Sequence, residues 1–286
     1  QNKITRTLFT GIQGTIKTLL MATAFDHQPD KYIIITDNQY HASELYNDLS
    51  EFVGEEKVFQ YFSDDNIFAE YAVASKERLA YRLDALSFLQ NKQADGFLII
   101  PIFALRNLLP NPVSFKTFNL LFTVGQEIDS DGLINQLSTI GFEKTQRVMS
   151  PGEYSKRGDI LDIYPLDAEN PIRIEFFGDE IDGIRYFDVE NQRSLQELDT
   201  VNIKPSSDFI LSAADFERGV NYLSSLINLD EKQRSYLAEI IAAAKHQNYH
   251  ADLRKFSEFF YEQQWTLFDY LPKHTPIFID DFQKIN

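Results

Sequence analysis

Short apolar runs alternate with longer amphipathic stretches in the first third of the sequence, and this alternation constrains the fold more than any other feature. The runs KYIIIT (31–36) and FLIIP (97–101) have no alternating polar face, which is typical of strands buried on both sides. The stretches 39–53 and 75–90 carry apolar residues at helical spacing. Strand and helix in alternation predict a parallel sheet with covering helices, that is, an α/β domain.

The stretch GIQGTIKT has most of a phosphate-binding P-loop, whose pattern is G-x-x-x-x-G-K-[ST]. Gly11, Lys17 and Thr18 match this pattern, whereas Ile16 stands where the second glycine belongs. A strand-like run (5–10) precedes the stretch and an apolar helical run follows it, which is the order that a P-loop requires. A β-branched side chain disfavours the backbone conformations that glycine permits and fills the space that a phosphate must approach. We therefore expect impaired or absent ATP binding; the alternative is an ordinary strand-to-helix turn.

The pattern changes twice beyond this region. Mostly short strands with one helix follow the proline-rich stretch LLPNPVS, and long helical stretches follow residue 206. The closing run TPIFIDDFQ again has the pattern of a buried strand, so we expect the chain to return and complete the first sheet. We predict a degenerate RecA-like, P-loop-derived parallel-sheet domain formed by residues 1–117 and 207–286, interrupted by an inserted α+β domain at residues 118–206.

Composition excludes several classes of protein. A formal net charge of −16 over 286 residues argues against a broad nucleic-acid-binding face, which needs clustered Lys and Arg. The sequence has no cysteine, and therefore no disulfide, thiol nucleophile or thiolate metal site. The longest apolar runs are too short to span a bilayer, and we expect neither a signal peptide nor a membrane partner. These features predict a cytoplasmic protein.

Two further residue pairs have the spacing of known sites. Asp280 and Asp281 end the last strand-like run, as a Walker-B pair does when it holds Mg²⁺, but solvated strand ends have the same appearance. His246 and His250 have the i, i+4 spacing of a zinc site, but Gln247 stands where the catalytic glutamate would be. We expect inherited geometry at the first pair and a solvated helix face at the second. No metal site and no nucleophile are predicted.

The run IRIEFF is an alternating strand followed by the hairpin turn GDE. Its alternation places Ile172, Ile174 and Phe176 on one face. Arg173 and Phe177 then lie on the opposite face. If the isoleucine face is the core, an aromatic ring and an arginine lie together on the outside.

An exposed aromatic residue beside an arginine has the composition of a protein–protein hot spot. Both side chains supply a large contact area, and arginine pairs with carboxylates through two hydrogen bonds. The alternative is that Phe177 covers a neighbouring helix and that Arg173 pairs with Glu175 or Asp182. Periodicity leaves both interpretations open.

Three segments, GEYSKRGDILDIYP, IRIEFFGDEIDGIRYFD and NQRS, resemble the domain shared by the nucleotide-excision-repair helicase UvrB and the Mfd family of transcription-repair coupling factors. The resemblance extends from about Thr5 to the end of the chain. UvrB has an intact P-loop and an aromatic-rich hairpin that clamps DNA, and this sequence has neither. The coupling factors begin with a UvrB-like amino-terminal module that has lost its ATP site, and the chain is similar to that module.

The resemblance implies a non-enzymatic docking module without a cofactor. Its inserted domain would bind the damage-recognition ATPase UvrA through Arg157 of the KRG motif and through Arg173 and Phe177 of IRIEFF. It also implies that the full-length protein removes RNA polymerase stalled at DNA lesions, using a motor and partner-binding regions outside this chain. The alternative is an ATP-dependent, UvrB-like DNA helicase fragment with a divergent but working nucleotide loop. A DNA-binding scaffold without a protein partner is a third hypothesis, which the acidity disfavours.

Overall fold

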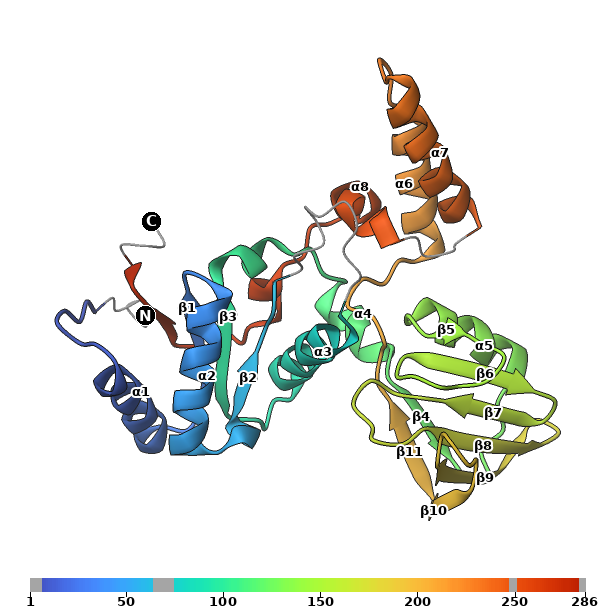
Figure 1. The fold of residues 1–286 in the computed structure, drawn as a ribbon, viewed down its shortest axis with the longest axis horizontal. Coiled ribbons are helices and arrows are strands. Elements are labelled where there is room, and N and C mark those ends of the chain that lie inside the picture. Colours follow the sequence, from blue (N-terminus) through green and yellow to red (C-terminus); the bar gives the residue numbers. More distant parts are fainter. Residues whose placement is uncertain (1–6, 64–74, 247–250, 283–286) are drawn as a thin grey trace. The chain divides into compact units, whose positions relative to one another are not determined.

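The computed structural model describes residues 7–63, 75–246 and 251–282 (Figure 1). Contacts between residues divide the chain into two compact units. The first contains residues 1–63, 85–105 and 271–286, and the second contains residues 64–84 and 106–270. Helix α3 (Lys76–Gln90) is divided between them. In the part of the chain that the structure describes, no helix has the length and apolarity needed to cross a membrane.

The first unit is built on a parallel sheet. Its strands lie in the order β12-β1-β3-β2, and every neighbouring pair is parallel. All residues of β1 and β3 are buried, as expected for strands covered on both faces. The predicted parallel α/β sheet is therefore confirmed, while its RecA-like descent stays a proposal. The elements are α1 (Thr15–His27), β1 (Lys31–Thr36), α2 (Gln39–Val53), η1 (Glu55–Lys57), β2 (Val58–Gln60), β3 (Gly96–Pro101), η3 (Ile102–Arg106) and β12 (Ile277–Ile279).

Local signals set the ends of α2 and the start of β3. The Asn38 side chain accepts a hydrogen bond from the backbone N–H of His41, which caps the first turn of α2. Gly54 ends this helix at a positive φ of 92°. Gly96 has a φ of 140°, and a Cβ atom there would lie 2.3 Å from the carbonyl oxygen of Lys57. Only glycine permits this approach between β3 and the segment before β2.

The predicted strand at 5–10 is wrong for the residues that the structure describes. Residues 7–10 have no regular structure and are exposed, and residues 5 and 6 lie outside the described ranges. Leu8 is 78% exposed and Phe9 is 56% exposed. A strand requires a partner whose N–H and C=O groups complete its ladder, and no described strand pairs with residues 7–10. The run that closes the chain does form a strand, because β12 pairs with β1. Its predicted burial is wrong, because β12 is an edge strand of the described sheet in which Ile277 is 43% and Ile279 46% exposed.

The second unit contains a six-stranded sheet in the order β10-β9-β8-β7-β6-β5, which is antiparallel except for the β5–β6 pair, and a two-stranded sheet β11-β4. Buried residues of α5 and of the larger sheet form one apolar core, which includes Leu137, Tyr154 and Ile174. The elements are β4 (Leu120–Thr123), α5 (Ser130–Thr139), β5 (Glu143–Lys144), β6 (Glu153–Arg157), β7 (Ile160–Ile163), β8 (Ile172–Phe177), β9 (Glu180–Phe187), β10 (Ser194–Leu198) and β11 (Thr200–Ile203).

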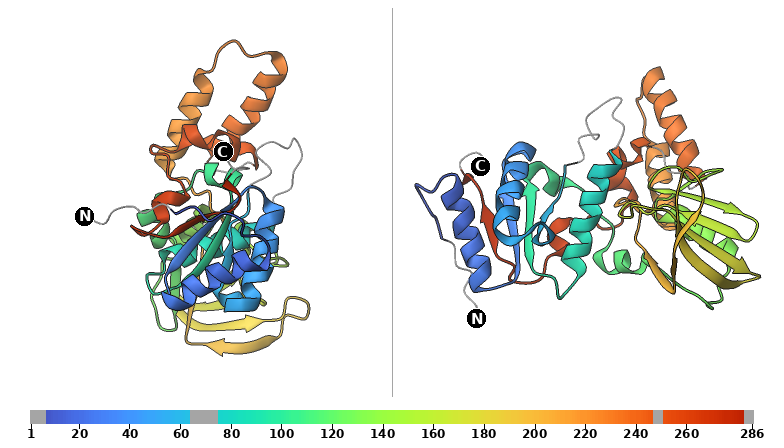
Figure 2. Two further views of the ribbon diagram at one scale, coloured as in Figure 1. Left: turned by 90° about the vertical axis from the view of Figure 1, so that its left-hand side faces the viewer. Right: turned by 60° about the horizontal axis from the view of Figure 1, so that its bottom comes forward.

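The rest of the second unit is helical, and Figure 2 shows α6 and α7 as a hairpin. Capping boxes begin both helices: Ser212 pairs with Asp215 in α6, and Asp230 pairs with Gln233 in α7. A separate apolar cluster joins these helices to the segment that follows them. The elements are α4 (Pro112–Thr117), α6 (Ala213–Ser225), α7 (Glu231–Lys245), η4 (Ala251–Phe256), α8 (Ser257–Phe260) and η5 (Leu267–Tyr270).

The contact-defined units differ from the predicted domain boundaries. Helices α6 to α8 cluster with the second unit, whereas the prediction grouped residues 207–286 with the parallel sheet. The physical reason is the shared packing of these helices with Phe209 and Leu211, at the end of the strand-rich region, and with Leu108. The division into domains at residues 117 and 206 therefore stays a prediction.

A buried ion cluster reinforces the second unit. The Asp208 carboxylate is fully buried and accepts hydrogen bonds from Arg82 Nε at 2.7 Å and from Arg254 Nη2. Burial by itself would raise the pKa of Asp208, but the positive charges of Arg254 and Arg82 outweigh it and hold that pKa well below its ordinary value. The cluster joins α3, the segment before α6 and η4.

We predict that Asp208→Asn destabilises the chain by about 3–5 kcal/mol, since it leaves two arginines without their buried counter-charge. Urea unfolding at pH 7 measures this difference. Because the folded-state pKa lies below the ordinary value of 3.8, the stabilisation is complete at neutral pH and is lost as the pH falls through the folded-state value. The gap between wild type and variant should therefore narrow below about pH 4.

Glu217→Gln is the matched control, because Glu217 is an exposed acid of α6. We expect it to change the free energy of unfolding by no more than about 0.5 kcal/mol. Equal effects of the two substitutions would show that the buried cluster contributes nothing to stability.

Candidate functional site

The loop that resembles a P-loop leads into α1. Gly14 precedes the helix at a φ of 56°, and Ile16 lies in its first turn with 64% of its surface exposed. Lys17 Nζ forms an ion pair with Asp280 Oδ2 at 2.7 Å, and the Asp280 backbone N–H donates to the carbonyl of Ile35 at the end of β1. The structure thus brings together the lysine and the first aspartate that the sequence singled out, and each neutralises the other.

Thr18, the residue that would hold Mg²⁺ in a working P-loop, is fully buried. Its Oγ1 atom has no hydrogen-bond partner within the described ranges. The hydroxyl is therefore not accessible to a metal ion or nucleotide in this structure. Asp281, next to the ion-paired Asp280, has a positive φ of 52°.

The histidine pair is only half described. His246 caps the carboxyl end of α7, and His250 lies outside the described residues. Among the residues with described positions, no group of three or more His, Asp or Glu side chains is arranged to hold a metal ion.

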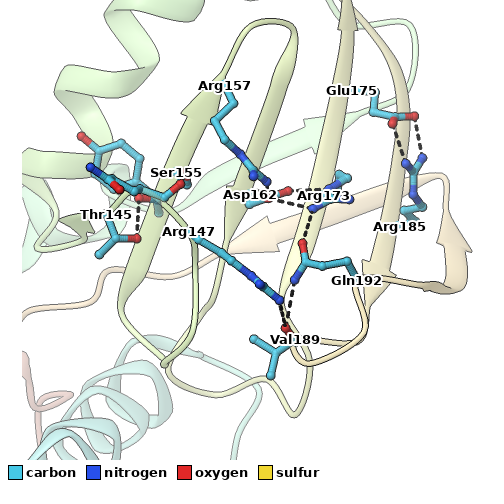
Figure 3. A network of polar contacts seen from close by, with 12 residues as sticks. Thr145, Arg147, Ser155, Arg157, Asp162, Arg173, Glu175, Arg185, Val189 and Gln192 are labelled. Carbon is cyan, nitrogen blue, oxygen red and sulfur yellow. Dashed lines mark hydrogen bonds and ion pairs between the residues drawn. The ribbon is translucent and has the colours of Figure 1, made fainter.

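A polar row crosses the outer face of the six-stranded sheet. The strand register pairs Ser155 with Asp162, Asp162 with Arg173, and Arg173 with Arg185. Paired residues point to the same face of a sheet, so these side chains lie side by side across four strands (Figure 3). The alternation predicted for IRIEFF is borne out by the burial of β8, in which every second residue is in the core.

Asp162 is the centre of this row. It is 1% exposed, and its two oxygens accept hydrogen bonds from Arg173 Nε at 2.6 Å and Arg173 Nη2 at 2.9 Å. Arg157 Nη2 donates to Asp162 Oδ2 at 2.8 Å (Figure 3). The Arg157 side chain is 48% exposed, whereas that of Arg173 is 12% exposed. Two guanidinium groups therefore share one buried carboxylate, and only one of them reaches the surface.

Arg173 is also tied to the loop between β9 and β10. Its Nη2 donates to Gln192 Oε1 at 2.9 Å, and its guanidinium lies 4.3 Å from the centre of the Phe187 ring. Gln192 has a positive φ of 61° and donates to the carbonyl of Val189. Arg147 Nη2 donates to the same carbonyl at 3.1 Å (Figure 3). Two arginines thus fasten this loop.

Arg185 and Glu175 form a separate pair beside the row. Both guanidinium Nη atoms of Arg185 donate to the Glu175 carboxylate. This hydrogen bonding holds the pKa of Glu175 below its ordinary value and raises the pKa of Arg185. Arg173 does form an ion pair, but its partner is Asp162, so the alternative that paired it with Glu175 or Asp182 named the wrong carboxylates.

Phe177 is the last residue of β8 and is 83% exposed. Gly178 follows it at a φ of 65°, which starts the turn into β9. With this exposure, Phe177 does not cover a neighbouring helix. The ring is the most exposed phenylalanine of the described chain, on the same strand as Arg173 and four residues beyond it.

Asp162, Gln192 and Arg147 were missed by reasoning from the sequence. Asp162 did carry a signal, since a charged residue inside the apolar run ILDI indicates a buried and paired charge. Gln192 lies in the NQRS segment, but nothing in the sequence indicates its contact with Arg173, and Arg147 carries no such signal, because these partners are remote in sequence.

Comparison with known proteins adds two findings. Residues 120–209 match the family model of the UvrB interaction domain, so the match covers the whole six-stranded sheet. Over 98% of its length the chain is 32% identical to the transcription-repair-coupling factor of Bacillus subtilis (strain 168) and 34% identical to that of Staphylococcus aureus (strain MRSA252). It spans 24% of the length of each of these relatives.

Adjacent phenylalanines of β8 offer a matched pair for testing the geometry. We predict that Phe177→Ala changes the free energy of unfolding by no more than about 0.5 kcal/mol, because little apolar surface is buried there. Phe176→Ala should cost about 3–5 kcal/mol, because Phe176 is 6% exposed and belongs to the core. Urea unfolding of both variants measures the difference, and equal losses would contradict the assignment of the two faces.

Proposed function

We propose that this chain, which is related over almost its whole length to transcription-repair-coupling factors, is a non-catalytic docking module that recruits UvrA to lesion-stalled transcription complexes. The UvrA-binding site lies on the outer face of its six-stranded sheet and includes Arg157, Arg173 and Phe177. The observation that carries the proposal is the exposed ring of Phe177 on the same face as the arginine cluster, inside the match to the UvrB interaction domain.

The charges of this face support an acidic partner surface. The chain has a net charge of −16, yet four arginines, Arg147, Arg157, Arg173 and Arg185, lie along this part of the sheet (Figure 3). Arg185 is paired with Glu175, and Arg157 and Arg173 share Asp162, which leaves more positive charge than negative charge in this row. Among the described residues the Arg157 guanidinium donates one hydrogen bond, to Asp162, so its other donors are available for a carboxylate of the partner. Binding through this residue should weaken as salt is raised, because exposed charges are screened.

The parallel-sheet unit is proposed to be a RecA-like domain that has lost its ATP site. Ile16 in the first turn of α1, the pairing of Lys17 with Asp280 and the burial of Thr18 support this proposal. Since the relatives are about four times as long as the chain, a motor and the binding sites for RNA polymerase and DNA would lie in the remainder of the protein. The proposed location is the cytoplasm.

The docking proposal predicts that Phe177→Ala or Arg157→Ala weakens binding to purified UvrA by about 2 kcal/mol or more, or roughly 30-fold in Kd. A truncated hot-spot side chain loses its contact area and leaves its partner groups unpaired. Isothermal titration of UvrA with each variant at one salt concentration measures the change.

Phe103→Ala is the control, since Phe103 is 64% exposed and lies in the first unit. It should bind UvrA with wild-type affinity. If all the variants bind like the wild type, the outer face of the sheet is not the docking surface.

The competing hypothesis of an ATP-dependent helicase fragment predicts stabilisation by nucleotide. A ligand present at a hundred times its Kd adds about 2.7 kcal/mol to the stability of the folded state. We expect Mg-ATP to leave the Tm of the chain unchanged in a calorimetric melt. A rise in Tm that disappears in Lys17→Ala would instead support a working nucleotide loop.

A further inference from the structure

We propose that Asp162 and Arg173 are positioning residues of the docking face and that Arg157 is the arginine that touches the partner. This inference rests on the proposed function, and it changes the role that the sequence resemblance implies for Arg173. In this assignment Arg173 is largely buried and contributes by holding Asp162 and the β9–β10 loop in place.

Arg173 has little to offer a partner directly. Its Nε and Nη2 atoms donate to Asp162, and Nη2 also donates to Gln192. One face of its guanidinium is covered by the Phe187 ring, and 12% of the side chain is exposed. A hot-spot arginine needs free donors at the surface, and most of the donors and surface of Arg173 are already used within the protein.

Arg157 is held by the same carboxylate. Asp162 Oδ2 accepts from Arg157 Nη2 at 2.8 Å and from Arg173 Nη2 at 2.9 Å. The carboxylate thus lies between two positive charges that would otherwise repel each other. Asp162 is the ion-pair partner of the Arg157 guanidinium among the described residues, and without it this long side chain would sample many rotamers. Ordering that side chain in advance removes part of the cost of binding.

The network also gives a role to the NQRS motif, residues 191–194. Gln192 takes up a left-handed backbone conformation and uses its side-chain amide to join Arg173 to the carbonyl of Val189. The next residue, Arg193, is exposed. Arg173 therefore also fixes the β9–β10 loop, to which Arg193 belongs.

A double-mutant cycle on UvrA binding separates positioning from contact. Asp162→Asn and Arg173→Gln should each weaken binding roughly 2- to 12-fold, the cost of ordering one rotamer-rich side chain. In the Arg157→Ala background, each should change Kd by less than about twofold, because the side chain that they position is gone. If Arg173→Gln weakens UvrA binding in the Arg157→Ala background as much as it does in the wild type, Arg173 touches UvrA itself and the proposal is overturned.

A second measurement does not depend on UvrA. In NMR spectra, the Nε–Hε signal of Arg157 should be that of an ordered side chain in the wild type and should become motionally averaged in Asp162→Asn. An unchanged signal would overturn the positioning role even if UvrA binding fails altogether. Absence of wild-type binding would instead remove the proposed function, so the two failures are distinguishable.

The single substitution at Asp162 leaves buried guanidinium charge without its partner and risks unfolding. The paired variant Asp162→Asn with Arg173→Gln removes both buried charges and keeps hydrogen-bonding groups at both positions. We expect this variant to have a wild-type far-UV circular dichroism spectrum, a mobile Arg157 signal and a weakened affinity for UvrA. A paired variant that folds, keeps Arg157 ordered and binds UvrA at wild-type affinity would contradict the proposal.

Discussion

A carboxylate buried in the outer face of the six-stranded sheet controls how that face is organised. Asp162 is 1% exposed, and a full negative charge in such a place is tolerated only where cations and hydrogen bonds neutralise it. The two arginines that do so come from β6 and β8, on either side of β7. Because the buried Asp162 carboxylate needs counter-charges, Arg157 and Arg173 are held beside it, and the Arg157 guanidinium remains at the surface.

The Asp208 cluster has the same composition, one carboxylate and two arginines, but all three side chains, including those of Arg82 and Arg254, are largely buried. The cluster therefore holds α3 and η4 together and presents little charge to solvent. At Asp162 the arrangement is open on one side, because Arg157 ends a strand and half of its side chain reaches solvent. The same chemistry thus stabilises a fold in one place and supports the proposed recognition surface in another. Exposure of the second cation makes the difference.

The two units of the chain differ in how far the charged residues of their candidate sites are exposed to solvent. In the parallel-sheet unit, Lys17 and Asp280 neutralise each other at the carboxyl ends of the strands, where α/β sheets commonly bind ligands. In the second unit, the Arg157 guanidinium is paired with Asp162 and still reaches solvent, on an otherwise acidic chain. This contrast agrees with the docking role proposed above for a chain that is similar to transcription-repair-coupling factors.

Local periodicity by itself determined the two central strands of the parallel sheet and the two faces of β8. The buried runs at 31–36 and 97–101 became strands of a parallel sheet, and the alternation in IRIEFF placed Phe177 outside, because side-chain direction follows directly from position along a strand. Tertiary structure alone decided that residues 7–10 form no strand and that Arg173 is buried against Asp162, Gln192 and Phe187. Both outcomes depend on partners from other strands and loops, and strand register and burial are set by long-range contacts that no local pattern encodes.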